Sequence, residues 1–307
     1  AMQLVVAALA LGARTLTGQT WLGSTARSQS SALATLSMSE ERCQIAPESY
    51  TLISTNLLAE LLSCTPHENE TPALAAPLRN RYFGLRHGQS EANVAGIISS
   101  DPSIGTTMHG LTALGRLQAR RAATTLVDLV GRENLGSTHF YSSDFTRALQ
   151  TAEEALAGVI NLLEYENSVE TDDSLELPAL PSSLTDGVKV TPLVRERYFG
   201  DFDGTVLSNY QQVWPRDLVS AQHTTFGVES VQDVTRRLRE CILQMEEQHD
   251  GCTIVLVSHA DTLQIAQCYL AGADCRTFCQ YRFKNGEVRL LAQGEDTLPA
   301  PVPLSYQ

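Results

Sequence analysis

The chain has 307 residues and carries 35 acidic against 22 basic side chains, which gives a net charge of −13 at neutral pH. A protein this acidic is not expected to bind nucleic acid, because the phosphate backbone favours basic surfaces. The bulk charge also repels anionic small molecules, so a phosphate site would need a few arginines acting at short range.

Residues 1–39 differ in composition from the rest of the chain. Their only charged side chains are Arg14 and Arg27, and serines and threonines are frequent. Such a leader predicts an organelle transit peptide, for the chloroplast or the mitochondrion, with a secretory signal and an ordinary tail as alternatives. The apolar run at residues 4–11 is too short to span a bilayer, so no membrane partner is expected.

Residues 40–78 are predicted to form a linker with one short helix. Leucines recur at helical spacing in its first part, and prolines interrupt the second part. These residues are Leu57, Leu58, Leu61 and Leu62, followed by Pro66, Pro72 and Pro77.

Alternating apolar strands and amphipathic helices begin at Arg79 and predict one α/β domain over residues 79–293. The pattern indicates three layers, αβα, with a mostly parallel central sheet. The first strand runs directly into Arg86-His87-Gly88. The next helix is expected to begin after a Thr112 cap and to end at Gly131.

A second strand, around residues 139–141, leads into a helix with Arg147 in its first turn. This helix is expected to end before Gly158. Residues 164–187 combine clustered acidic side chains with prolines, which predicts a solvated insertion.

A third strand, at residues 188–194, precedes Glu196, and residues 205–227 are predicted to form an irregular cap over the site. Ser230 is placed to cap the helix that follows. Residues 253–258 are apolar and β-branched without alternation, as in a strand covered on both faces, so this strand should lie centrally and end at His259. A hairpin of residues 281–283 and 288–291 closes the domain, and residues 294–307 form a tail.

Four stretches together carry a resemblance to a known family. They are Arg86-His87-Gly88, then Ser143 to Ala152 with the pattern Ser-x-x-x-Arg-Ala-x-x-Thr-Ala, then Glu196 ahead of Phe199-Gly200, then Ser258-His259. In this order they resemble the histidine phosphatase superfamily, in its phosphoglycerate-mutase-like branch 1. The resemblance covers roughly residues 79–293 and implies the fold of that family.

Phosphoryl transfer needs an in-line nucleophile and positive groups on the phosphate oxygens. His87 is the predicted nucleophile, and the family uses this position to form a phosphohistidine that water hydrolyses. Arg86 and Arg147 are expected to bind the non-bridging oxygens. His259, as a cation, and Asn93, as a neutral group, are expected to add further donors.

An acid is also needed to protonate the leaving oxygen. The resemblance implies that Glu196 is this proton donor, although an ion pair with Arg195 or Arg197 is an alternative role. No metal and no other cofactor are expected, because the histidines lie on separate elements and the arginines supply the positive charge. The remaining histidines, which are His67, His109, His139, His223 and His249, are expected to be surface or packing residues.

The seven cysteines are odd in number and lack the paired spacing of zinc or dithiol sites, so reduced thiols are expected and their redox role stays open. The favoured function is hydrolysis of a small phosphorylated substrate, whose identity the sequence leaves open. A mutase is the first alternative, but the loop after Asn93 lacks the Gly-Trp segment of glycolytic mutases. A non-catalytic phosphate-binding or docking module is the second alternative, and the oligomeric state is left open.

Overall fold

The structure is a computed structural model that describes residues 71–74, 77–170, 179–292 and 298–302, without the side chains of residues 165–170. The predicted leader (1–39), the predicted short helix near Leu57 and parts of the acidic insertion and tail lie outside the described residues. Within the described ranges no helix is both long and apolar enough to cross a membrane.

A five-stranded sheet forms the centre of the fold, in the order β3-β2-β4-β1-β5. All neighbours are parallel except β1 and β5, which pair antiparallel. The predicted mostly parallel sheet is therefore confirmed. The strands are β1 (Arg81–Arg86), β2 (Thr138–Ser142), β3 (Val188–Val190), β4 (Thr253–Ser258) and β5 (Val288–Ala292).

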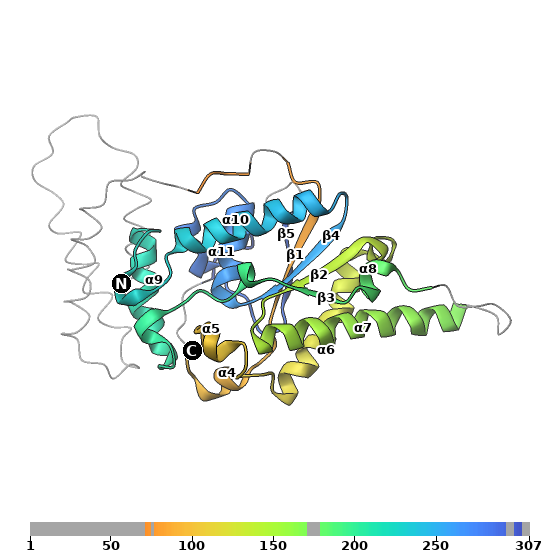
Figure 1. The fold of residues 1–307 in the computed structure, drawn as a ribbon, viewed down its shortest axis with the longest axis horizontal. Helices are drawn as coiled ribbons and strands as arrows, with labels where there is room; N and C mark the ends of the chain where they lie inside the picture. The colour runs from red at the N-terminus through yellow and green to blue at the C-terminus, as the bar shows by residue number, and fades with distance from the viewer. Residues whose placement is uncertain (1–70, 75–76, 171–178, 293–297, 303–307) are drawn as a thin grey trace, which may run out of the picture. The chain divides into compact units, whose positions relative to one another are not determined.

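Helices cover both faces of the sheet, with α10 (Val231–Gln248) and α11 (Ala260–Leu270) on one side and α6 (Ala113–Val130) and α7 (Thr146–Glu170) on the other (Figure 1). All six residues of β4 are buried. Ile254 packs into the core beneath α10 and α11, whereas Val255 packs into the core beneath α6 and α7. Because side chains alternate along a strand, β4 serves two cores and must be apolar throughout, as its sequence predicts.

The predicted helix starts are confirmed by their caps. The Thr112 hydroxyl accepts a hydrogen bond from the Gly115 backbone N–H, and the Ser230 hydroxyl accepts one from the Asp233 N–H. Each bond satisfies a backbone donor that has no partner within its helix.

The prediction that the second helix ends before Gly158 is wrong, because α7 continues to Glu170. A Cβ on Gly158 would lie 2.6 Å from the Cβ of Ala123 in α6, so this glycine permits close helix packing and does not end the helix. The expected solvated insertion is also only partly correct. Leu184, in α8 (Ser182–Thr185), is 1% exposed and belongs to the core beneath α6 and α7.

The cap and the final strand also differ from expectation. Residues 205–227 contain a regular helix, α9 (Tyr210–Val219), whose Trp214 is 2% exposed. Residues 281–283 are not a strand, so the predicted hairpin does not form, and β5 pairs with β1 instead. The Phe283 N–H donates to Gln264 Oε1 and its carbonyl accepts from Arg86 Nη1. Both backbone groups are therefore used by side chains and do not bond to a neighbouring strand.

Candidate active site

The carboxyl ends of two parallel strands bring the two predicted site histidines together. Arg86 pairs in register with Ser258, so His87 and His259 follow neighbouring strands at the same edge. The His87 N–H donates to the Ser258 carbonyl at 2.9 Å, and the two imidazole centroids are 5.2 Å apart. This is the edge where open α/β sheets bind ligands.

A pocket of about 330 Å³ opens beside His87, and the predicted site residues line it, with the exception of His259. Its size lies near the lower end of the range for small-molecule sites, about 300–1,000 Å³. The lining also includes four residues that sequence reasoning gave no role, namely Tyr210, Trp214, Asp261 and Arg282.

One ring nitrogen of His87 is held by the backbone. Nδ1 lies 2.7 Å from the Gly88 carbonyl oxygen, which can only accept a hydrogen bond, so the proton resides on Nδ1. Nε2 therefore carries the lone pair, and it accepts a hydrogen bond from Arg147 Nε at 3.3 Å. Burial, and then the charges of Arg147 and Arg86, lower the pKa of His87 well below its usual value. The ring is neutral at neutral pH, which is the form that can act as a nucleophile.

Gly88 serves this arrangement by its small size. A Cβ there would lie 2.3 Å from the Gly115 carbonyl oxygen at the start of α6. The strand can thus approach the helix closely at the point where His87 enters the pocket.

Both predicted phosphate-binding arginines are held by carbonyl oxygens, and Arg147 is buried whereas Arg86 is partly buried. Arg147 Nη2 donates to the Ser99 carbonyl at 2.8 Å, and Arg86 Nη1 donates to the Phe283 carbonyl at 2.6 Å. Burial lowers the pKa of both guanidinium groups, to about 10 for Arg147, which therefore stays charged at neutral pH. Arg86 Nε is buried and has no hydrogen-bond partner in the described part of the chain.

His259 occupies its predicted place but is fully buried behind the pocket. Its Nε2 lies 2.9 Å from the Ser143 hydroxyl, and its Nδ1 has no hydrogen-bond partner among the described residues. Burial, followed by the charge of Arg147, lowers the pKa of His259 well below its usual value. The ring is therefore neutral here, which differs from the cation expected from the sequence.

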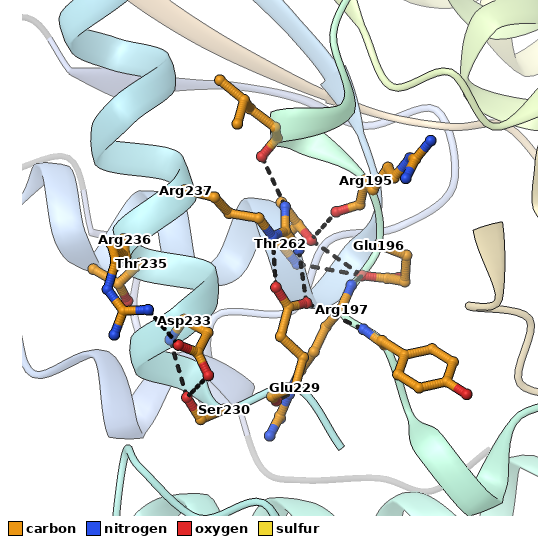
Figure 2. Close-up of polar contacts among 12 residues, drawn as sticks. Arg195, Glu196, Arg197, Glu229, Ser230, Asp233, Thr235, Arg236, Arg237 and Thr262 are labelled. Carbon is orange, nitrogen blue, oxygen red and sulfur yellow. Dashed lines mark hydrogen bonds and ion pairs between the residues drawn. The ribbon is translucent and has the colours of Figure 1, made fainter. Parts of the chain in front are cut away.

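In the described ranges, Glu196 does not form an ion pair with Arg195 or Arg197, which was the alternative to its role as proton donor. Arg195 Nε donates to Asp144 at 2.8 Å, and Arg197 donates two bonds to Asp217, so neither guanidinium pairs with Glu196 within the described ranges. Instead, Glu196 Oε1 accepts from the Arg197 backbone N–H at 3.0 Å and from the Thr262 hydroxyl at 3.3 Å (Figure 2). Glu196 lines the pocket, and no arginine of the described ranges pairs with its carboxyl group.

Asn93 lines the pocket as predicted, but its carbonyl oxygen is already used. Oδ1 accepts from the Ser90 backbone N–H at 3.0 Å, in the capping box of the short helix α4 (Glu91–Ala95), and from Asn285 Nδ2 at 3.2 Å. Only the amide NH₂ of Asn93 is left to meet a ligand.

Asp261 and Arg282 are the charged groups of the pocket that sequence reasoning missed. Asp261 accepts a hydrogen bond from Trp214 Nε1 at 3.0 Å, and burial together with the negative charge of Glu196 raises its pKa to about 7. The Arg282 guanidinium lies 4.6 Å from the Trp214 ring centroid. Asp261 lies two residues after His259, so its position next to a predicted site residue could have identified it. Arg282 could not be identified in this way, because it lies where a hairpin strand was expected.

The fold and the site define an α/β protein built for phosphoryl groups, because a neutral imidazole and two guanidinium groups face one pocket at the carboxyl edge of a parallel sheet. Residues 83–175 and 179–299 match the profile of the histidine phosphatase superfamily (branch 1). The chain belongs to this superfamily of phosphatases, as its motifs predict.

Solved structures agree with this assignment at the level of the fold. A protein from an open reading frame of Mycobacterium tuberculosis is 20% identical, with a TM-score of 0.51 over 72% of this chain and 96% of that chain. A mycobacterial glucosyl-3-phosphoglycerate phosphatase is 23% identical, with a TM-score of 0.50 over 69% and 90%. A comparison with curated proteins found no match.

Proposed function

We propose that the protein hydrolyses the phosphomonoester of a small metabolite through a phosphohistidine intermediate on His87. The observation that carries this proposal is the orientation of the His87 ring, whose Nδ1–H is fixed by the Gly88 carbonyl while Nε2 points to Arg147. A nucleophile held in one tautomer beside a phosphate-binding group needs little reorganisation before attack.

The proposed reaction has two steps. First, Nε2 of His87 attacks phosphorus while the ester oxygen leaves with a proton from Glu196, and Arg86 and Arg147 stabilise the equatorial oxygens. Water then attacks the phosphohistidine and gives a proton to Glu196, which releases phosphate and restores Nε2. The amide of Asn93 is a further donor for the phosphate oxygens, and His259 acts from behind the pocket through its contacts with the His87 ring and Ser143.

Hydrolysis should be separable from the mutase alternative by its product. Incubation with 3-phosphoglycerate, with or without the 2,3-bisphosphate, is expected to release free phosphate at least as fast as it forms the isomer. Isomerisation with negligible phosphate release would support the mutase instead.

The proposed mechanism uses no metal, so EDTA should leave the rate of phosphate release unchanged. Loss of activity in EDTA that returns with added metal would contradict the metal-independent mechanism.

The proton-donor role of Glu196 predicts an effect that depends on the leaving group. Glu196→Gln is expected to slow alkyl phosphates by about 10²–10³-fold, but to slow activated aryl phosphates less than about tenfold, because only the former need a protonated leaving oxygen. Initial rates on a matched pair of esters test this. Equal losses on both would assign Glu196 a structural role.

A second anionic group on the substrate is favoured by Arg282. Its Nη1 is buried without a hydrogen-bond partner in the described part of the chain, although the side chain lines the pocket. Arg216, a basic residue of α9, does not line the pocket and lies over the Phe226 ring. We therefore propose phosphorylated carboxylates or bisphosphates as the substrate class.

This substrate class predicts a selective defect. Arg282→Gln should raise KM for a phosphorylated carboxylate such as phosphoserine by roughly 10–100-fold, in keeping with the loss of a charge-assisted hydrogen bond. KM for glycerol phosphate, which has no second anionic group, should change little, and Arg216→Gln should leave both unchanged. An equal rise in KM for both esters would contradict a second anionic subsite.

A further inference from the structure

Three potential metal ligands meet at the amino edge of the sheet, opposite the pocket. They are His139, in the first half of β2, His249, at the end of α10, and Cys252, directly before β4. One ligand atom from each lies within 4.8 Å of the other two, and the two imidazole centroids are 4.2 Å apart. From the sequence, these histidines were expected to be surface or packing residues and Cys252 a reduced thiol, and no metal site was expected because the histidines lie on separate elements.

The cluster contains one buried polar atom that lacks a hydrogen-bond partner within the described ranges. His139 Nδ1 is buried and has no hydrogen-bond partner among the described residues. A buried nitrogen of this kind costs free energy unless it meets a donor or a cation. The Cys252 thiol donates one hydrogen bond, to the Asp250 carbonyl at 3.5 Å, which it would give up on becoming a thiolate. The Tyr141 hydroxyl lies 2.8 Å from His249 Nε2 and orients this ring, as a hydrogen bond to the other ring nitrogen does in histidines that bind metals.

The electrostatic surroundings keep both imidazoles neutral, which is the form that binds metals. Burial and the neighbouring His249 lower the pKa of His139 to about 4, and burial lowers the pKa of His249 as well. The positive charge of Lys189, on β3, also lowers the pKa of both imidazoles and would repel a bound cation. The negative charge of Asp186 raises the pKa of His139. A thiolate ligand from Cys252 would offset the charge of Lys189.

We propose that His139, His249 and Cys252 form a binding site for one zinc ion, with a water molecule as the fourth ligand. Two imidazole nitrogens and one sulfur are a ligand set for zinc and not for magnesium or calcium, which prefer oxygen. Each ligand atom must move inward by about 0.5–0.8 Å to reach zinc bonds of about 2.0–2.3 Å. Binding releases the Cys252 thiol proton to solvent and joins the turn after α10 to β2.

Cobalt can report on this site directly, because a thiolate bound to Co²⁺ produces a charge-transfer absorption band. The full chain, without a histidine tag and stripped by chelation, should bind one Co²⁺ with this band, and Zn²⁺ should displace it. Cys252→Ser should remove the band and weaken zinc binding at least about tenfold, and His139→Gln should weaken zinc binding similarly. Cys275→Ser, which changes another partly buried cysteine, should retain both signals.

Thermal unfolding gives a second readout. An ion that binds only the native state should raise Tm by several degrees in the wild type and in Cys275→Ser, but not in Cys252→Ser. Phosphate release should be unchanged in Cys252→Ser, since the cluster lies at the opposite edge of the sheet, and this activity confirms that the variant is folded. A cobalt band that survives in Cys252→Ser, or a zinc-dependent rise in Tm that is equal in all variants, would overturn the proposal.

Discussion

His87→Ala is expected to lower phosphate release by a factor on the order of 10⁴ or more, on every ester that the wild-type protein hydrolyses. The reason is that the proposed covalent intermediate forms on the His87 ring. Arginines in the pocket remain charged, so the variant should still bind phosphate esters. Initial rates and binding of an ester, measured side by side, test both parts of this expectation.

A matched histidine change shows whether this loss is specific. His249→Ala alters a partly buried imidazole at the amino edge of the sheet, so it should leave turnover within about threefold of the wild type. His87→Ala should also keep a Tm close to that of the wild type, because it removes a ring beside a pocket and leaves the core intact. Turnover by His87→Ala at more than about a tenth of the wild-type rate would contradict the assignment of the nucleophile.

The second large effect is expected from the buried ion pair that holds the Glu196 segment. Arg197 and Asp217 are both 0% exposed and joined by bonds of 2.6 and 2.7 Å. Asp217→Ala would leave the guanidinium buried without its carboxylate, at a cost of about 3–5 kcal/mol. We expect Tm to fall by roughly 10 °C, and turnover to fall as well because Arg197 follows Glu196 directly.

Two variants give this prediction its controls. The double change Arg197→Met and Asp217→Leu removes both charges and should recover much of the stability that Asp217→Ala loses. Arg120→Met breaks a pair with Glu154 at a position that is 62% exposed, so Tm should change little. If Asp217→Ala were as mild as Arg120→Met, the buried pair would not stabilise the fold as argued.

The parts of the site that follow single strands could be predicted from the sequence. Arg86 and His87 end one apolar strand and His259 ends another, and parallel strands bring such ends to one edge. The central position of β4 followed from its lack of alternation. These inferences needed only local patterns and the handedness and order of an α/β sheet.

The partners of these residues could not be predicted, because each comes from a distant element. Among the residues that the structure describes, Glu196 makes no ion pair, since Asp144 and Asp217, from other parts of the chain, pair with the neighbouring arginines. The burial of His259 depends on Phe145 and Ser143, which pack against or bond to its ring. Local charge patterns cannot reveal which of several carboxylates an arginine will meet.

Two further predictions, the end of a helix and the exposure of a segment, were wrong because a glycine and a leucine take part in tertiary packing. Gly158 suggested a helix end, but it lies at the contact between α6 and α7, where a larger side chain would collide. Leu184 lies in a segment whose acids and prolines predicted solvent exposure, yet it fills the core beside β2. Both outcomes were decided by tertiary packing, which overrides local preference.

In the proposed mechanism, Nε2 of His87 carries the phosphoryl group between the two steps. Rapid trapping of the phosphorylated protein tests this directly. Wild-type protein mixed with a ³²P-labelled ester and quenched in alkali should carry label that is stable to base, labile to acid and located in the peptide containing His87. Glu196→Gln, in which hydrolysis of the intermediate is slowed, should accumulate more label when an activated aryl phosphate is used. Equal labelling of His87→Ala, or label on another residue in the wild type, would contradict the account.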